Sequence, residues 1–222
     1  MVRVLVTGGA GYVGSHACKE LARAGHVPVA YDDLSRGHSE LVKWGPLVQG
    51  DIRDPAALRA ALRQHRPAAV MHFAALSYVD ESVRLPLAYY DVNVRGTLTL
   101  LTAMRDEGIN RIVFSSSCSV YDQGHPGPLD ESAPLAPLHP YGESKAMVEQ
   151  MLRDAAGAGL DSVALRYFNA SGADPDGETG EWHDPETHLI PRLLAAAAGS
   201  DPEFRVNGAD YATDLTDFLY RS

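Results

Sequence analysis

Apolar residues in the first three quarters of the chain follow two alternating patterns. Short, nearly continuous apolar runs predict buried strands, and longer stretches with apolar positions at helical spacing predict amphipathic helices. The predicted strands are residues 2–6, 27–31, 68–73, 111–115 and 162–167, and the predicted helices are 13–24, 55–65, 86–107 and 141–158. This alternation favours an α/β fold, a doubly wound parallel sheet of the Rossmann type with right-handed crossovers.

The pattern changes after Asn169. Residues 170–188 are rich in Gly, Pro and Asp and predict a loop, residues 189–198 predict a helix, and residues 199–222 resemble the start of a smaller lobe. We therefore expect a Rossmann domain at 1–168, followed by a partial substrate-binding lobe at 169–222.

Composition narrows the function classes. The chain has 29 Asp and Glu against 19 Lys and Arg, a net charge of -10, so a nucleic-acid partner is not expected. No stretch approaches the roughly 20 apolar residues of a membrane helix, so no membrane partner is expected either. The two cysteines, Cys18 and Cys118, form no C-x-x-C pair, which favours reduced thiols and a cytoplasmic location.

A glycine cluster joins the first predicted strand to the first predicted helix. Gly9, Gly11 and Gly14 satisfy G-x-G-x-x-G, while Gly8, Gly11 and Gly14 satisfy a related spacing. Glycines allow backbone N–H groups to approach a pyrophosphate, and the N-terminus of the following helix adds positive potential. Because the motif lies between a strand and a helix, it predicts a dinucleotide site.

Asp32 ends the second predicted strand, where a carboxylate can accept hydrogen bonds from ribose hydroxyls. The same carboxylate repels a 2′-phosphate, so we expect NAD in preference to NADP. Arg36 opposes this interpretation, because a nearby arginine can bind that phosphate.

A serine, a tyrosine and a lysine form the candidate catalytic set. Tyr141 and Lys145 are four residues apart and share one face of the predicted helix. A strand ends in Ser115, Ser116 and Ser117, and ligands of such sheets bind at strand carboxyl ends. We expect the lysine ammonium to stabilise the tyrosine phenolate, whose ordinary pKa of about 10 is too high for a base. The serine hydroxyl can bind the substrate oxygen while the tyrosine takes its proton.

These motifs together resemble the extended short-chain dehydrogenase/reductases, and longer strings are similar to the UDP-glucose 4-epimerase family. The strings are Ser82–Tyr90 (SVRLPLAYY), Asn93–Leu98 (NVRGTL), Pro140–Lys145 (PYGESK) and Leu165–Asn169 (LRYFN), within a resemblance that covers residues 1 to 211. It implies NAD-dependent epimerisation at C4 of a UDP-sugar (UDP-glucose or UDP-galactose) through a transient 4-keto intermediate. It also implies a homodimer that pairs through helices 86–107 and 141–158.

The resemblance assigns roles to residues of this chain. It implies Ser117, Tyr141 and Lys145 as catalytic. The implied cofactor residues, besides Tyr141 and Lys145, are Gly8, Gly11, Tyr12, Val13, Asp32, Asp33, Leu34, Ser35, Asp51, Ile52, Phe73, Ala74, Ala75, Asn93 and Phe168. The implied substrate residues, besides Ser117 and Tyr141, are Asn169, His188 and Leu189, and a strand around Arg205 to Asn207 would lie at the edge of the uridine.

The chain departs from the family at several positions. Ser77 replaces a frequent lysine that reaches the cofactor phosphates, and His188 replaces an asparagine. After Tyr211 the family continues for on the order of a hundred residues, about the size of a small domain. We therefore expect a truncated chain that holds NAD but is a poor epimerase.

Three interpretations stay open at this point. Besides an epimerase, the chain could be another nucleotide-sugar epimerase or a dehydratase of the same superfamily, or a truncated NAD-binding protein without catalysis. Dehydratase relatives place acidic residues just after the strand-end serine, and Cys118–Tyr121 (CSVY) has none. The segment His183–His188 (HDPETH) contains ligand types for a metal, but the sequence favours a polar loop, and no metal is expected.

Overall fold

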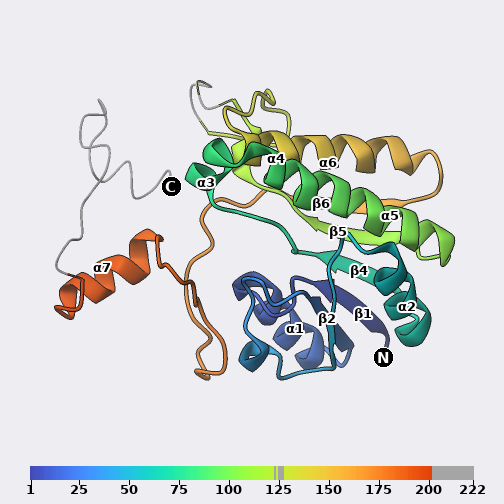
Figure 1. Cartoon of the computed structure of the whole chain (residues 1–222), viewed down its shortest axis with the longest axis horizontal. Coiled ribbons are helices and arrows are strands. Elements are labelled where there is room, and N and C mark those ends of the chain that lie inside the picture. The colour runs from blue at the N-terminus through green and yellow to red at the C-terminus, as the bar shows by residue number, and fades with distance from the viewer. Residues whose placement is uncertain (123, 125–127, 202–222) are drawn as a thin grey trace. The chain divides into compact units, whose positions relative to one another are not determined.

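The structure is a computed structural model that describes residues 1–122, 124 and 128–201 (Figure 1). The chain divides into two compact units, Met1–Tyr167 and Phe168–Ser222. The expected strand around Arg205 to Asn207, with the rest of 202–222, lies outside the described residues.

The first unit contains one parallel sheet of six strands in the order β3-β2-β1-β4-β5-β6. The strands are β1 (Arg3–Thr7), β2 (Val27–Asp32), β3 (Leu47–Gln49), β4 (Ala69–His72), β5 (Arg111–Ser115) and β6 (Asp161–Leu165). This strand order is that of a Rossmann fold and confirms the predicted class. The sequence did not predict β3, because three residues are too short to show an apolar period.

Helices connect the strands. They are α1 (Tyr12–Arg23), α2 (Pro55–His65), α3 (Val79–Arg84), α4 (Pro86–Tyr89), the π-helical turn η2 (Tyr90–Arg95), α5 (Gly96–Asp106) and α6 (Pro140–Ala156), with short 3₁₀ turns η1 (Ser39–Leu41) and η3 (Cys118–Val120). The helix expected for 86–107 forms from Pro86 to Asp106, with the π-helical segment η2 inside it. Where α5 follows η2, the Thr97 hydroxyl donates to the Asn93 carbonyl at 2.5 Å, a bond from side chain to backbone of the kind that bends helices.

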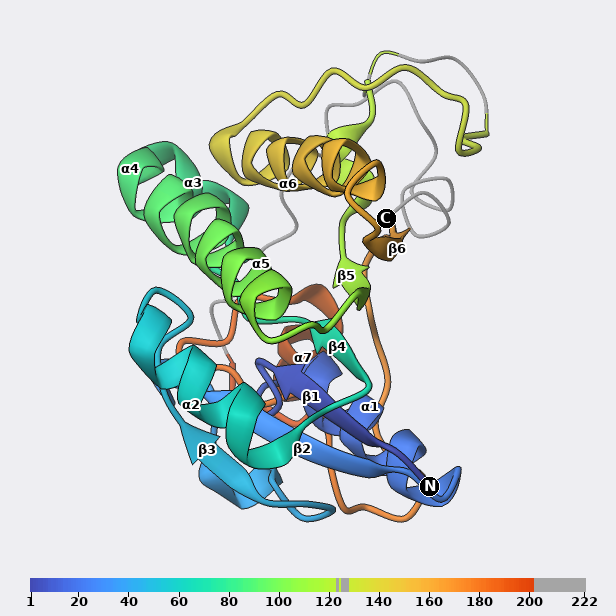
Figure 2. The same ribbon diagram turned by 90° about the vertical axis from the view of Figure 1, so that its right-hand side faces the viewer.

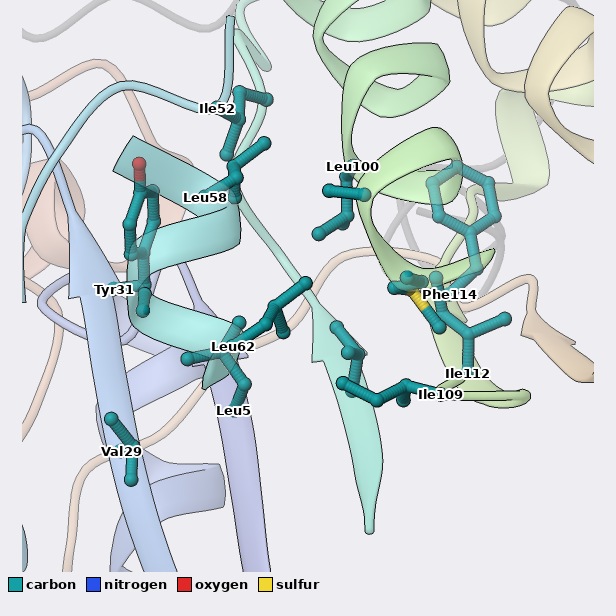
Figure 3. Packing of buried hydrophobic residues seen from close by; sticks show 14 of the residues in the cluster. Leu5, Val29, Tyr31, Ile52, Leu58, Leu62, Leu100, Ile109, Ile112 and Phe114 are labelled. Carbon is teal, nitrogen blue, oxygen red and sulfur yellow. The ribbon is translucent and has the colours of Figure 1, made fainter. Parts of the chain in front are cut away.

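Alternate residues of each strand point to opposite faces of the sheet, and each face has its own core. Leu5 and Val70 belong to the larger core, which lies on the side of the sheet covered by α2, α5 and α6 (Figure 2). Figure 3 shows Leu5 with Leu62 of α2 and Leu100 of α5 in this core. Val4, Val6 and Met71, the neighbours of Leu5 and Val70 along the strands, pack on the other face, with Cys18 of α1. The larger core supports α6, the helix that carries the tyrosine and lysine of the candidate site.

The second unit has little regular structure in its described part. Residues 170–188 form no helix or strand, as predicted, and α7 (Leu189–Ala197) follows. Among the residues that the structure describes, no helix is both long and apolar enough to cross a membrane.

Candidate active site

The glycine loop lies between β1 and α1, packed against the segment that follows β4. Gly8 has a φ of +72°, and a Cβ there would lie 2.6 Å from the backbone nitrogen of Ala74. A Cβ at Gly14 would lie 2.0 Å from the Gly8 carbonyl oxygen. Both positions therefore require glycine. Because β1 and β4 are neighbours whose connections leave in opposite directions, the loop lies at the switch point where such sheets bind dinucleotides.

The N-terminus of α1 faces this loop without a side-chain cap. Gly11 occupies the N-cap position and has no side chain that could cap the helix. Tyr12 and Val13 are the first two residues of the helix. The first N–H groups of a helix have no partner within it and attract anions. This geometry suits a pyrophosphate.

Asn93 ties the segment after β4 to α6. Its side-chain oxygen accepts the Leu76 N–H at 2.8 Å, and its amide nitrogen donates to the Leu76 carbonyl and to the Ser144 hydroxyl, both at 3.0 Å. This bracing holds the backbone that runs from Phe73 through Ala74 and Ala75. The resemblance implies that Asn93 lies near the cofactor, and in the structure its side chain hydrogen-bonds to Leu76 and Ser144.

The carboxylate of Asp32 is buried beside the glycine loop. It accepts the Ala10 N–H at 3.0 Å and the Leu34 N–H at 2.9 Å. Burial raises the pKa of Asp32, and the two backbone N–H groups oppose that rise. Asp32 thus fixes the glycine loop and the turn after β2 in one geometry. In that turn Leu34 has a φ of +61°, and the Asp33 carboxylate accepts both the N–H and the hydroxyl of Ser35.

Two arginines, Arg36 and Arg53, form ion pairs with carboxylates of the first unit. Arg36 donates to Glu81 of α3 at 2.6 Å, and its guanidinium lies 5.0 Å from the centre of the Tyr78 ring. Arg53 pairs with Asp51 at 2.5 Å and with Asp91 at 2.8 Å, next to the buried Ile52. The pairing of Arg36 with Glu81 weakens the case that Arg36 serves a 2′-phosphate.

The three candidate catalytic side chains come from different elements and converge. Ser117 follows β5, while Tyr141 and Lys145 lie one turn apart on α6. The Ser117 hydroxyl lies close enough to the Tyr141 phenol to lower its pKa. The Lys145 ammonium donates to the Ser115 carbonyl at 2.8 Å, and its nitrogen lies 5.7 Å from the centre of the Tyr141 ring. The chain thus brings together a hydroxyl, a phenol and a buried amine.

The expected lowering of the pKa of Tyr141 by Lys145 is wrong for this structure. Burial raises the pKa of Tyr141 to about 12, although the hydrogen bond with Ser117 lowers it. Burial also lowers the pKa of Lys145 to about 7. Both side chains disfavour their charged forms because both are shielded from water. The spacing in the sequence predicted that Tyr141 and Lys145 are neighbours, but it did not predict how deeply they are buried.

The sequence missed two supporting groups. His139 caps α6 by accepting the Gly142 N–H on Nδ1 at 3.1 Å, and its ring stacks on that of Tyr141 with centres 6.0 Å apart. Below the site, the buried Glu149 accepts hydrogen bonds from the Ser116 hydroxyl and from Arg166, both at 2.6 Å. The position of Glu149, four residues after Lys145, was a signal that could have revealed it.

The remaining candidate residues belong to the second unit. Phe168 and Asn169 begin it, and His188 and Leu189 stand at the start of α7. Phe168 is 47% exposed and Leu189 is 36% exposed. Their contacts with a cofactor or substrate stay predictions.

Comparison with known proteins gives one family. Residues 4–221 match the model of the NAD dependent epimerase/dehydratase family. The chain is 54% identical over 211 residues to a UDP-glucose 4-epimerase of Rhizobium leguminosarum bv. trifolii, covering 95% of this chain and 64% of that protein. The chain therefore spans just under two thirds of the length of this curated relative.

Solved structures show the same likeness. The UDP-glucose 4-epimerase of Brucella ovis in complex with NAD has a TM-score of 0.93 at 52% identity, over 96% of this chain and 66% of that one. The UDP-glucose 4-epimerase of Bifidobacterium longum in complex with NAD⁺ and UDP has a TM-score of 0.90 at 36% identity. That match covers 95% of this chain and 67% of the other chain. The Rossmann architecture of the first unit is thus shared with proteins whose structures contain NAD.

Proposed function

Because the chain belongs to the NAD dependent epimerase/dehydratase family, we propose that it takes part in epimerisation at C4 of a UDP-sugar, between UDP-glucose and UDP-galactose. The observation that carries this proposal is the convergence of Ser117, Tyr141 and Lys145 at the strand end beside the glycine loop. Relatives at 54% and 47% identity are UDP-glucose 4-epimerases, which supports the choice of substrate.

The residues of the first unit fit NAD. The close approach at Gly8 and Gly14 leaves room for backbone only, and the uncapped start of α1 suits a pyrophosphate. The buried carboxylate of Asp32 disfavours the extra phosphate of NADP. Bound NAD would supply reversible hydride transfer at C4 of the sugar.

Each member of the catalytic set has a role in this proposal. Tyr141 removes the proton of the sugar 4-hydroxyl and later returns it. Ser117 donates a hydrogen bond to the same oxygen, which becomes the carbonyl of the 4-keto sugar. Lys145 holds its amine 2.8 Å from the Ser115 carbonyl oxygen and 5.7 Å from the centre of the Tyr141 ring, so it acts as a positioning group beside the base.

We propose a homodimer and a cytoplasmic location as well. Exposed apolar side chains on the candidate pairing helices support the dimer: Leu87 of α4 is 80% exposed, Leu98 of α5 is 53% exposed and Met147 of α6 is 45% exposed. Neither Cys18 nor Cys118 is in a disulfide, which is consistent with a reducing compartment.

The test is turnover of UDP-galactose in the presence of NAD⁺, measured as the formation of UDP-glucose. It is made with this chain and with a version continued by the C-terminal third of the Rhizobium relative. Tyr141→Phe is the matched variant, because it keeps the ring and removes the proton-transferring oxygen.

We expect turnover that falls by about 10²- to 10⁴-fold in Tyr141→Phe, with NAD binding within a few-fold of the unaltered chain. Activity retained in the variant would show that Tyr141 is not the base. Absence of turnover in both unaltered versions would contradict the proposed reaction.

A further inference from the structure

Two histidines and two glutamates of the second unit converge in the segment that precedes α7. They are Glu181, His183, Glu186 and His188, within eight consecutive residues. One ligand atom from each lies within 4.8 Å of the others. All four residues are half-buried. The sequence favours a polar loop here, and only the structure reveals that these side chains meet.

The distances suit a shared ligand. Nδ1 of His188 lies 2.9 Å from a Glu181 oxygen and 2.8 Å from a Glu186 oxygen. Nδ1 of His183 lies 3.4 Å from Glu181 and 3.9 Å from Glu186. Zinc binds nitrogen and oxygen at about 2.0–2.2 Å, so ligand atoms at the corners of a tetrahedron are about 3.3–3.6 Å apart. The observed separations bracket that value.

The charges of the cluster point to a cation as well. Two carboxylates approach the single Nδ1 of His188, which carries at most one proton to share between them. Like charges this close in a partly dry site repel unless a cation lies between them. A dication with two neutral imidazoles and two carboxylates makes the set electrically neutral.

We propose that Glu181, His183, Glu186 and His188 bind a divalent transition-metal cation, with zinc as the best match. Two imidazole nitrogens with two carboxylate oxygens are ligands that zinc accepts, and they are unlike the all-oxygen sets of calcium and magnesium. Four protein ligands close a tetrahedral site, which is the arrangement of a structural metal.

Such a metal would anchor the start of α7. His188 is the N-cap residue of α7 and makes no side-chain capping hydrogen bond. No residue of α7 is buried, so apolar packing does little to hold this helix in place. A metal that joins His188 to three residues just before it would fix the entry of the chain into the helix.

A second acidic group in the same unit offers a control. Asp174, Asp176 and Glu178 also lie within ligand distance of one another, but the group has no imidazole, and Asp176 and Glu178 are exposed. We propose no metal there. Glu178→Gln removes a carboxylate from the same unit and leaves the four-residue cluster intact.

The experiment uses the chelator-treated full chain, without cofactor or substrate. Zn²⁺ is titrated against a chromophoric chelator to obtain stoichiometry and affinity, and Co²⁺ is added separately to record its visible absorption. His183→Asn, Glu181→Gln and the control Glu178→Gln are measured alongside, with circular dichroism to verify that each variant keeps its helix content.

We expect one zinc per chain and the intense visible absorption of tetrahedral Co²⁺. Affinity should fall by at least about tenfold in His183→Asn and Glu181→Gln, since changes even in the supporting shell of a metal site cost 10- to 100-fold, and it should be unchanged in Glu178→Gln. If the unaltered chain binds no zinc, or gives only the weak absorption of octahedral Co²⁺, the proposal is overturned. Equal affinity in all variants would also overturn it. The proposed epimerase reaction needs no metal, and its assay can be run in chelator, so the two proposals fail independently.

Discussion

Helices α6 and α7 both contain apolar residues at helical spacing, but they differ in how far those residues are buried. In α6, Val148 and Leu152 are buried against the sheet, together with the polar Ser144, Lys145 and Glu149. In α7 no residue is buried, and Leu193 and Leu194 are 49% and 64% exposed. The spacing of apolar residues predicts that a helix forms, and it does not specify what covers the helix. Two of the candidate catalytic side chains, Tyr141 and Lys145, lie on the helix that packs against the sheet.

The largest expected contrast in stability comes from one leucine in each region. Leu100 of α5 is fully buried in the core that supports α6, so Leu100→Ala should cost about 2–5 kcal/mol of unfolding free energy. Leu194→Ala should change it by less than about 0.5 kcal/mol, because that side chain is mostly in solvent. Urea unfolding measures both, and equal losses would contradict the contrast.

A second prediction concerns the pH dependence of the buried lysine. Burial lowers the pKa of Lys145 from 10.5 to about 7. Between those values the unfolded chain binds a proton that the folded chain lacks, so stability should rise with pH over this window. Lys145→Met should lose that rise in stability. The contributions of the other titrating groups are common to both proteins and cancel in the difference between them. The measurement is urea unfolding at pH 7.5 and pH 9.5, and parallel changes in both proteins would refute a neutral buried amine.

The smallest of the three contrasts is expected at the start of α2, which packs on the same core as α6. The Asp54 carboxylate accepts the N–H groups of Ala56 and Ala57 at 2.8 and 3.1 Å. Asp54→Ala should therefore cost about 1 kcal/mol. Asp106→Ala, at the last residue of α5, removes a carboxylate that caps no helix N-terminus and is the control. Thermal unfolding of the two variants distinguishes them, and equal midpoints would show that the cap contributes nothing.

The sequence predicted the elements that have a clear period or terminal signal. Helix α2, with Pro55 at its first position, and β5 were predicted to the residue. The sequence missed β3 and α3, which are too short to show a period. At the candidate site it predicted that Tyr141 and Lys145 are neighbours, because a spacing of four places two side chains on one helix face. It did not predict the raised pKa of Tyr141, the pairing of Arg36 with Glu81, or the meeting of Glu181 with His188, since each depends on burial or on a loop path.

The central claim is that the first unit by itself forms a site for NAD, with Asp32 and the glycine loop selecting it over NADP. Calorimetric titration of the unaltered chain with each cofactor tests this most directly, and Arg36→Ala serves as the companion variant. We predict tighter binding of NAD⁺ than of NADP⁺, and no loss of NADP⁺ affinity in Arg36→Ala, because Glu81 holds that guanidinium. Equal or tighter binding of NADP⁺ by the unaltered chain, lost in Arg36→Ala, would contradict the account.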